Sequence, residues 1–523
     1  NLTLIAGDDI SFSDQVVSNN NMVLDAGQDV HITEAVIHTA FDNLVVTAAN
    51  IYMVADSEWD VIGSASLEAS NDIELALITV RGDGSVSLGA GADAYDFTGL
   101  NLSADNITMN QSLDLGQIST PVYTANLHVN SGSEFTITDG NDVRLNGVAN
   151  ITATDFVMGT GSIIAAGDDL TISANDIDAG KLYSLIGDIS LTSQTDLDIN
   201  DHITTDTDGI IELSAVDTLT MLAGAEVFSD NTLDVDAATI TMATSASLGA
   251  YKDVTITSNS GGMVLGEIDV RDNLILTALD QNIALNADLD AYDALTVYAS
   301  DVTQADNTRI RAGDTSLTVD NYFSGDGASF NVNYADLLVN ASGIVEFGTL
   351  SVRGGYQGQG NSQINAGGTV SFASNTSING DLSIEAAGDV SFEDTLMVGA
   401  KDVVEVGTFY SSVDIATDGN ITFEGDVTVT RNLDVSKATN VSIQSDALVT
   451  GDTNIQATGL VTLSDGKIIE SDNLEINSVN FEMGAASELS TSQGLTLRAQ
   501  KNQTLATINV GSNFDSAANG ETT

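Results

Sequence analysis

The chain contains no cysteine and a single proline, Pro121, and only 5% of its 523 residues are aromatic. Without cysteine there is no disulfide framework. Proline removes a backbone donor from a hydrogen-bonded ladder, so its scarcity is typical of a chain with extensive strand pairing. Apolar residues still make up 42% of the sequence, which is enough to bury a core and argues against disorder. With so few aromatic side chains, that core must be narrow and filled by Val, Ile, Leu and Ala.

Basic residues are also scarce, because 14 Lys and Arg stand against 75 Asp and Glu, for a formal net charge of −61. Nucleic acid is excluded as a partner, since phosphate binding needs clustered Lys and Arg, and anionic membranes are disfavoured for the same reason. A surface of this charge binds cations non-specifically and suits salty water, which screens its self-repulsion. No run of 18 apolar residues occurs, so we expect no membrane-spanning helix.

The strongest positive signal is an internal repeat. Two apolar residues alternate with polar ones and are followed by alanine; two or three small or polar residues and a second apolar pair complete the motif. The first copy consists of Leu2, Leu4, Ala6, Ile10 and Phe12. Further copies begin at Met22, Leu44, Leu100, Leu170, Leu233 and Leu295. Equivalent residues lie 20, 21 and 22 positions apart in the series Ile10, Val30, Ile51 and Ile73.

Alternation with a period of two predicts strands rather than helices, and the Gly, Asn and Asp that follow each strand favour tight turns. We therefore predict an all-β fold, a right-handed parallel β-helix (β-solenoid) with roughly 20–22 residues per coil. Dividing the 523 residues by this period gives about 25 coils and, at about 4.8 Å per coil, a rod of about 120 Å. Equivalent side chains should form inward ladders, as at Phe372, Phe392 and Phe423. The recurrent alanine indicates a corner too narrow for a larger side chain.

The register of the motif makes specific residues inward-facing. Asp8, Asp9 and Asp29 should lie at corners in water. The residues expected to point inward are Leu4, Ile10, Val30, Ile51, Leu102 and Ile107.

The repeat extends over nearly the whole chain. We expect one continuous β-solenoid over residues 1–511, with irregular coils or loop insertions near 85–147 and 322–368, and a polar tail or linker over 512–523. The sequence starts at Asn1 inside a repeat, without an initiator Met, signal peptide or basic leader. We therefore expect a processed or truncated piece of a larger protein.

Units such as NLTLIAGDDISF, DLTISANDIDAG and DGNITFEGDVTV resemble the haemagglutinin repeats of filamentous-haemagglutinin-like exoproteins, a group of large repetitive bacterial adhesins. The resemblance implies a right-handed β-helix, secretion through an outer-membrane partner, and roles in adhesion, biofilm or contact between cells. It also implies a secreted or cell-surface location on a Gram-negative bacterium, and the charge is compatible with a marine one. The secretion cap of that family has no counterpart here, and an autotransporter passenger or another large adhesin would look similar.

No arrangement of residues predicts catalysis. The four histidines (His31, His38, His128 and His202) are scattered, and the closest basic pair, Arg309 and Arg311, shares one strand face. We therefore expect no catalytic residues and no required cofactor. A β-helical enzyme acting on polysaccharides is a remaining alternative, since such enzymes use Asp pairs with Lys or Arg in a groove.

Carboxylates clustered at turns predict weak Ca²⁺ binding, because hard cations prefer oxygen ligands. Solvated aspartates that cap turn amides explain the same pattern, and no complete EF-hand loop occurs. The candidate ligands are Asp196, Asp198, Asp201, Asp206, Asp208, Asp288, Asp290 and Asp293. Arg81–Gly82–Asp83 spells the tripeptide that integrins recognise, in an expected turn, but a tripeptide of common turn residues is weak evidence.

The leading hypothesis is a non-enzymatic extracellular structural rod, the stalk of a bacterial surface adhesin. Its partners would be a host or neighbouring-cell surface or matrix polysaccharide. The alternative is a self-assembling subunit of an extracellular filament, matrix or sheath that binds itself end to end, because the first coil carries a full apolar repeat and no polar cap.

Overall fold

The computed structural model describes residues 1–34, 37–40, 42–54, 57–61, 63–80, 100–115, 126–353, 360–399 and 411–519. Within these ranges the chain forms 63 strands and no helix. The strands pair in parallel with strands one coil away, and the fold is a β-solenoid of about 22 turns. This confirms the prediction of an all-β, parallel, stacked-coil fold. There are fewer turns than the expected 25 because some coils are long: the register partners Ala65 and Leu100 are 35 residues apart.

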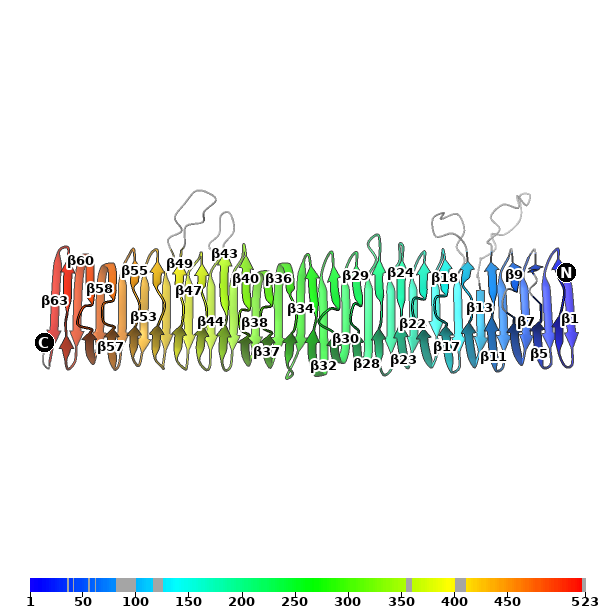
Figure 1. Ribbon diagram of the computed structural model, residues 1–523, viewed down its shortest axis with the longest axis horizontal. Helices are drawn as coiled ribbons and strands as arrows, with labels where there is room; N and C mark the ends of the chain where they lie inside the picture. Colours follow the sequence, from blue (N-terminus) through cyan, green and yellow to red (C-terminus); the bar gives the residue numbers. More distant parts are fainter. Residues whose placement is uncertain are drawn as a thin grey trace, which may run out of the picture. The chain divides into compact units, whose positions relative to one another are not determined.

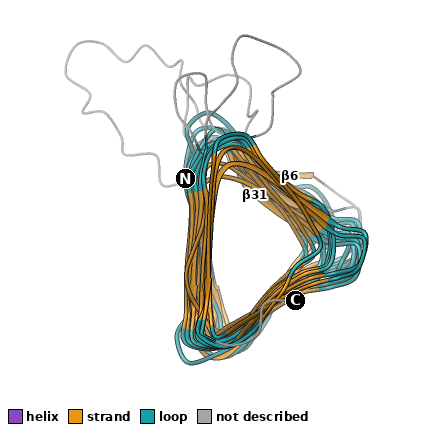
Figure 2. Cartoon of the chain, turned by 90° about the vertical axis from the view of Figure 1, so that its left-hand side faces the viewer, coloured by secondary structure: helices purple, strands orange, loops and turns teal. Residues whose placement is uncertain are grey.

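Each coil has three sides, which Figure 2 shows as the sides of a triangle. In the second coil these are β4 (Met22–Ala26), β5 (Asp29–Ile32) and β6 (Ile37–Ala40). We call the sides face 1, face 2 and face 3 in this order along the chain. Successive side chains alternate between the core and the outside, as in any strand, so the inward positions of β4 are buried and its Asp25 is exposed.

The chain divides into two compact units, residues 1–261 and 262–523. In unit 1, face 1 is a parallel ladder of successive first strands (blue to green in Figure 1). Its strands are β1 (Leu2–Ala6), β4, β7 (Leu44–Ala48), β10 (Ala65–Ala69), β13 (Leu100–Ala104), β16 (Leu127–Ser131), β19 (Ala149–Thr152), β22 (Leu170–Ala174), β25 (Ile189–Ser193) and the first parts of β28 (Ile211–Met221), β30 (Leu233–Met242) and β32 (Val254–Leu265).

Unit 2 repeats this arrangement (green to red in Figure 1). Several of its strands are long because they continue from face 3 around a corner into face 1, with a register shift at the corner, as between Ala291 and Ala294 of β36. Face 1 of unit 2 contains β34 (Asn273–Ala278), the second parts of β36 (Leu289–Ala299) and β38 (Arg309–Val319), β41 (Leu337–Ala341), β44 (Ser362–Ala366), β47 (Leu382–Ala386), β50 (Val413–Thr417), β53 (Leu433–Ala438), β56 (Thr453–Ala457), the second parts of β58 (Ile468–Ser478) and β60 (Glu488–Ala499), and β63 (Asn513–Ala518).

The core of unit 1 follows the predicted register. Of the six residues expected inside, five are buried and Leu4 is half-buried, because β1 pairs with β4 alone. Asp8 and Asp9 are exposed as expected, whereas Asp29 is half-buried. The five buried residues are Ile10, Val30, Ile51, Leu102 and Ile107.

A phenylalanine ladder fills part of the core of unit 2, as the sequence predicted. The rings of Phe372 and Phe392 stack with centroids 4.7 Å apart, and those of Phe392 and Phe423 with centroids 5.3 Å apart. Phe347, which the sequence pattern had not singled out, extends the stack at 5.7 Å from Phe372. Parallel pairing places these side chains in register on successive coils of face 2.

The segments expected to be irregular fall partly on 81–99, 116–125 and 354–359, which lie outside the described residues. The described residues beside them keep the coil pairing, for example β13 with β16 and β41 with β44. Residues 513–518, expected in a polar tail, form β63 and pair with β60. Their side chains lack the apolar alternation, but backbone pairing does not require it.

Candidate functional site

Two of the aspartates predicted as Ca²⁺ ligands in unit 1 accept turn hydrogen bonds through their carboxylates, and a third, Asp208, lies at a turn near Lys252. The Asp196 carboxylate accepts the N–H of Thr218 at 3.1 Å, and that of Asp206 accepts the N–H of Thr207 at 3.0 Å. Asp208 has a left-handed backbone (φ 64°), which Asp tolerates better than most residues. These contacts correspond to the alternative explanation of the acidic turns, in which carboxylates cap backbone amides.

The other two aspartates of this group face different neighbours. Asp198 lies outward on face 2, in register with Asp178 on the preceding coil. Burial, and then the negative charge of Asp198, raise the pKa of Asp178. Asp201 instead contacts the His202 ring, and this hydrogen bond lowers the pKa of Asp201. The five carboxylates therefore do not converge on one point.

In unit 2 a guanidinium group lies beside two of the three predicted ligands. The Nη2 of Arg309 lies 3.4 Å from Asp288 and 3.3 Å from Asp290. Burial raises the pKa of Asp290, although Arg309 opposes this shift. Asp293 is exposed at the neighbouring turn. Positive charge is thus already supplied to this carboxylate pair by the chain itself.

Within the described ranges, the one group of three acidic or histidine side chains whose ligand atoms lie within 4.8 Å of one another is Asp9, Asp29 and His31. The coil period brings Asp9 and Asp29 together, and this 20-residue spacing is the signal that could have found them in the sequence. The His31 ring stacks on Tyr52 with centroids 5.4 Å apart. None of the eight predicted aspartates belongs to this group, and the calcium prediction remains a prediction.

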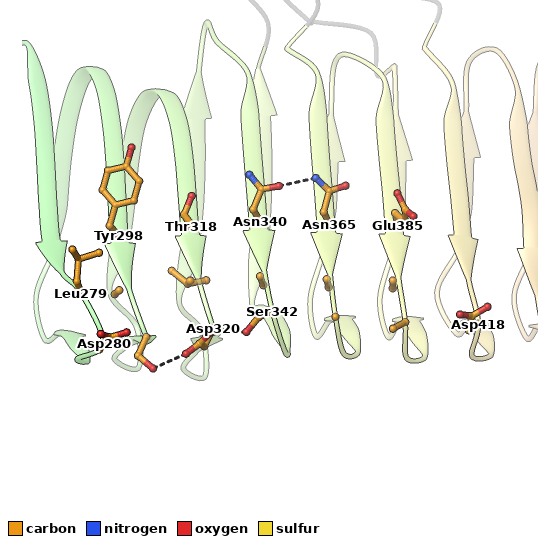
Figure 3. Close-up of a pocket in the computed structure, with 18 residues that line it drawn as sticks. Leu279, Asp280, Tyr298, Thr318, Asp320, Asn340, Ser342, Asn365, Glu385 and Asp418 are labelled. Carbon is orange, nitrogen blue, oxygen red and sulfur yellow. Dashed lines mark hydrogen bonds between the residues drawn. The ribbon is translucent and has the colours of Figure 1, made fainter.

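A trough of about 680 Å³ runs along face 1 of unit 2, over the ends of its strands (Figure 3). Each coil from β36 to β47 contributes the same three consecutive positions to it. The first position is an outward side chain, and we call these the outer row: Tyr298, Thr318, Asn340, Asn365 and Glu385. The second forms the floor: Ala299, Val319, Ala341, Ala366 and Ala386. The third lies at the corner, and the polar members of this corner row are Ser300, Asp320 and Ser342.

The floor contains the recurrent alanine of the sequence motif. Ala341, Ala366 and Ala386 are buried, as expected for a narrow corner. Strand alternation turns their side chains toward the core, while the outer row points outward. The trough therefore lies over the backbone of the floor, between the outer row and the corner row.

The outer row is in continuous register, because each member pairs with the next across one coil. The side-chain amide of Asn365 donates to that of Asn340 at 2.8 Å. Among the described residues, no hydrogen-bond partner contacts the side chains of Tyr298, Thr318 or Glu385, all of which are exposed. Polar groups about 4.8 Å apart are therefore open to solvent along one side of the trough.

The corner row carries negative charge. The hydroxyls of Ser300 and Ser342 donate to the Asp320 carboxylate at 2.9 and 2.6 Å. The bond from Ser342, and then that from Ser300, lower the pKa of Asp320. Asp280 and Asp418 line the two ends of the trough. The outer row therefore presents hydroxyl and amide groups with the Glu385 carboxylate at one end, whereas the corner side carries carboxylates and serine hydroxyls (Figure 3).

A second hollow of about 440 Å³ occupies the same positions on later coils of unit 2. Its outer side chains include Lys437, Gln456, Asn477 and Arg498. Lys437 forms an ion pair with Asp418 at the end of the first trough, and Arg498 lies 4.0 Å from Glu475.

Sequence reasoning did not find the trough, because steps between outer-row members vary and no motif marks them. Arg81–Gly82–Asp83 lies outside the described residues. The part of the chain that the structure describes contains no helix able to cross a membrane. No protein-family model, no curated protein and no solved structure matches this chain.

Proposed function

We propose that the chain is a non-enzymatic structural segment of a secreted or cell-surface bacterial protein, the stalk of a filamentous-haemagglutinin-like adhesin that mediates adhesion or biofilm contacts. The observation that carries the proposal is the continuity of the coil in each unit, where the same three strands recur around one buried apolar ladder. Every coil is hydrogen-bonded to its neighbours along the stack, so each unit resists bending and extension. A scaffold of this kind suits a protein that holds a binding surface away from a cell.

The electrostatics of the described residues support a scaffold over an enzyme. Catalytic acids and bases usually need a perturbed pKa inside a cleft. The raised pKa of Asp178 belongs to a carboxylate on a strand face, beside another carboxylate. In the trough the shift is in the opposite direction, since hydroxyl donors lower the pKa of Asp320. A carboxylate held ionised by two hydroxyls is poorly suited to act as a general acid.

The composition supports an extracellular location. The net charge of −61 and the absence of cysteine suit a salty, oxidising exterior, where the charge is screened and no thiol can be oxidised. The resemblance to secreted adhesin repeats also supports an extracellular location. The partners of such a stalk would be another cell surface or matrix polysaccharide, with an outer-membrane protein for secretion and no required cofactor.

The test is deletion of the coding region from the source bacterium, with a strain that re-expresses the intact protein as control. We expect immunogold labelling of intact cells to place the chain outside the outer membrane, and the deletion strain to lose attachment to surfaces or to other cells. Purified chain should release no reducing sugar from a panel of neutral and acidic polysaccharides. Labelling confined to the cytoplasm, unchanged attachment, or saturable glycan cleavage would each contradict the proposal.

A further inference from the structure

We propose that the trough on face 1 of unit 2 binds a linear, uncharged polysaccharide lying parallel to the stack of coils. This inference deepens the proposed function, and rests on it, by naming the ligand class of one surface. The trough is lined from Asp280 to Asp418 by seven successive coils, which is six steps of about 4.8 Å, or roughly 30 Å. A hollow of this length with the same three positions in each coil suits a polymer better than a compact small molecule.

The chemistry of the walls suits sugar hydroxyls. Hydroxyl and amide side chains can both donate and accept hydrogen bonds, as each sugar hydroxyl does. Thr318 has no partner among the described residues, and Asn340 accepts one hydrogen bond from Asn365 but donates none there. Their donors are thus free to exchange water for a ligand hydroxyl at little cost.

One end of the trough supplies apolar contact. The Tyr298 side chain is 39% exposed at one end of the outer row, beside Leu279, which is 65% exposed. An exposed aromatic ring on a trough lined with hydroxyls and amides offers a stacking surface with a polar tip.

Charge decides between neutral and anionic polymers. The lining includes the carboxylates of Asp280, Asp320, Glu385 and Asp418, and no Lys or Arg among the described residues that form it. Lys437 pairs with Asp418 at one end, but an anionic polysaccharide would place its carboxylates or sulfates against the other three carboxylates without a compensating cation in the lining. An uncharged chain meets no such repulsion.

Strand pairing decides between a glycan and an extended peptide. Peptides usually add to a sheet through a free strand edge. The strands below the trough have no such edge, because β41 pairs with both β38 and β44, and β44 pairs with both β41 and β47. Recognition must therefore use side chains, which favours a ligand rich in hydroxyls.

The experiment measures binding of the full chain to defined probes by affinity electrophoresis and titration calorimetry. The neutral probes are hydroxyethyl cellulose, laminarin and β-1,4-linked glucose and xylose oligomers; the acidic probe is polygalacturonate, and a random-sequence peptide library serves as the protein probe. We expect at least one neutral probe to bind, and Tyr298→Ala and Thr318→Ala each to weaken binding about tenfold, the size of effect of a lost stacking or hydrogen-bonding anchor.

Matched controls lie outside the trough. Tyr334→Ala removes a tyrosine that is 75% exposed, and Thr171→Ala removes an outward threonine of β22 in unit 1; both should bind like the unaltered chain. Because Tyr298, Thr318 and Tyr334 are exposed and Thr171 occupies an outward position of its strand, the melting temperature should change little in any variant. Asn365→Asp, within the outer row, should weaken neutral binding because it replaces an amide that both donates and accepts hydrogen bonds with a carboxylate that only accepts them.

The proposal is overturned if no neutral probe binds, if polygalacturonate or a peptide binds more tightly, or if the control substitutions weaken binding as much as the trough substitutions. Cells that carry Tyr298→Ala and Thr318→Ala together separate the polysaccharide-binding proposal from the proposed stalk function. If these cells still attach and the purified chain binds no glycan in vitro, the polysaccharide-binding proposal is wrong while the proposed stalk function is unaffected.

Discussion

Aspartate and asparagine side chains at the corners of the coils hydrogen-bond to the coil that follows. The Asp381 carboxylate accepts the N–H of Ser412 at 2.8 Å, and the Asn432 side-chain oxygen accepts the N–H of Asp452 at 3.0 Å. Asp and Asn are interchangeable in this role because both offer an acceptor oxygen. The abundance of Asp at turns therefore reflects capping of one coil by another, which is why counting carboxylates in the sequence could not identify a metal site.

The first prediction concerns this capping. Asn432→Ala should leave the Asp452 amide without its acceptor and cost about 1 kcal/mol in the free energy of unfolding. Asn432→Asp keeps an acceptor oxygen and is the matched control, with a smaller expected loss. Urea denaturation gives the energies, and hydrogen exchange of the peptide that contains Asp452 gives the local effect. Equal exchange in all three proteins would show that the side chain does not protect this amide.

The second prediction concerns the paired carboxylates of face 2. Burial and the charge of Asp198 raise the pKa of Asp178 above its ordinary value. A carboxyl whose pKa is raised in the folded state favours folding when it is protonated, and this contribution is lost as the pH rises through the folded-state pKa. Asp178→Asn should therefore raise the melting temperature at pH 7, and the gain should disappear below about pH 4, the ordinary range of Asp.

The control for this pair is Asp188→Asn. Asp188 caps the N–H of Ile210 at 2.8 Å, and asparagine retains that acceptor, so its effect at pH 7 should be smaller. A gain for Asp178→Asn that is the same at pH 7 and below pH 4 would contradict the electrostatic explanation.

Strands of two kinds build the coils, and the sequence predicted only one of them. Short strands such as β4 end at small or polar turn residues, so alternation and turn residues together reveal them. The long strand β36 passes around a corner between Ala291 and Ala294 without a glycine. Its sequence reads as one continuous strand, and only pairing with β38 shows that its two halves lie on different faces. The outer row of the trough depends on such registers, since Asn340 and Asn365 are 25 residues apart.

The third prediction tests the phenylalanine ladder of face 2. Phe392 lies between Phe372 and Phe423 in nearly parallel stacks, with interplanar angles of 2° and 7°. Phe392→Ala should cost about 3–5 kcal/mol through lost burial and the cavity left behind. In a stack of coils each repeat depends on its neighbours, so protection from hydrogen exchange should fall first in the coils on either side.

Phe514→Ala is the control for the ladder, since this side chain is 50% exposed on β63 and should cost little. A uniform loss of protection along unit 2, or an equal cost for the two substitutions, would show that stacking of the rings does not act locally.

Over the whole chain, the repeat period predicted the fold, but neither the period nor the charge could locate a binding surface. The expected core residues are buried because a period-two pattern must place Val30 and Ile51 on one side of a strand. The number of turns was less predictable, because the sequence does not show that Leu382 pairs with Val413, 31 residues later. The trough depends on side chains from coils that share no motif beyond alanine.

The last prediction concerns the net charge of −61. Carboxylates in register on adjacent coils, such as Asp414 and Asp434, repel one another, and the charge of Asp414, after burial, raises the pKa of Asp434. NaCl should raise the melting temperature by screening, and millimolar CaCl₂ should raise it further at equal ionic strength, because a divalent cation can bridge neighbouring carboxylates. Calorimetry should show weak Ca²⁺ uptake without a sharp stoichiometry; one or two tight sites would contradict distributed binding.

Light scattering and negative-stain images across the same NaCl and CaCl₂ series should show discrete particles, whereas uniform fibres would favour the filament alternative over the stalk.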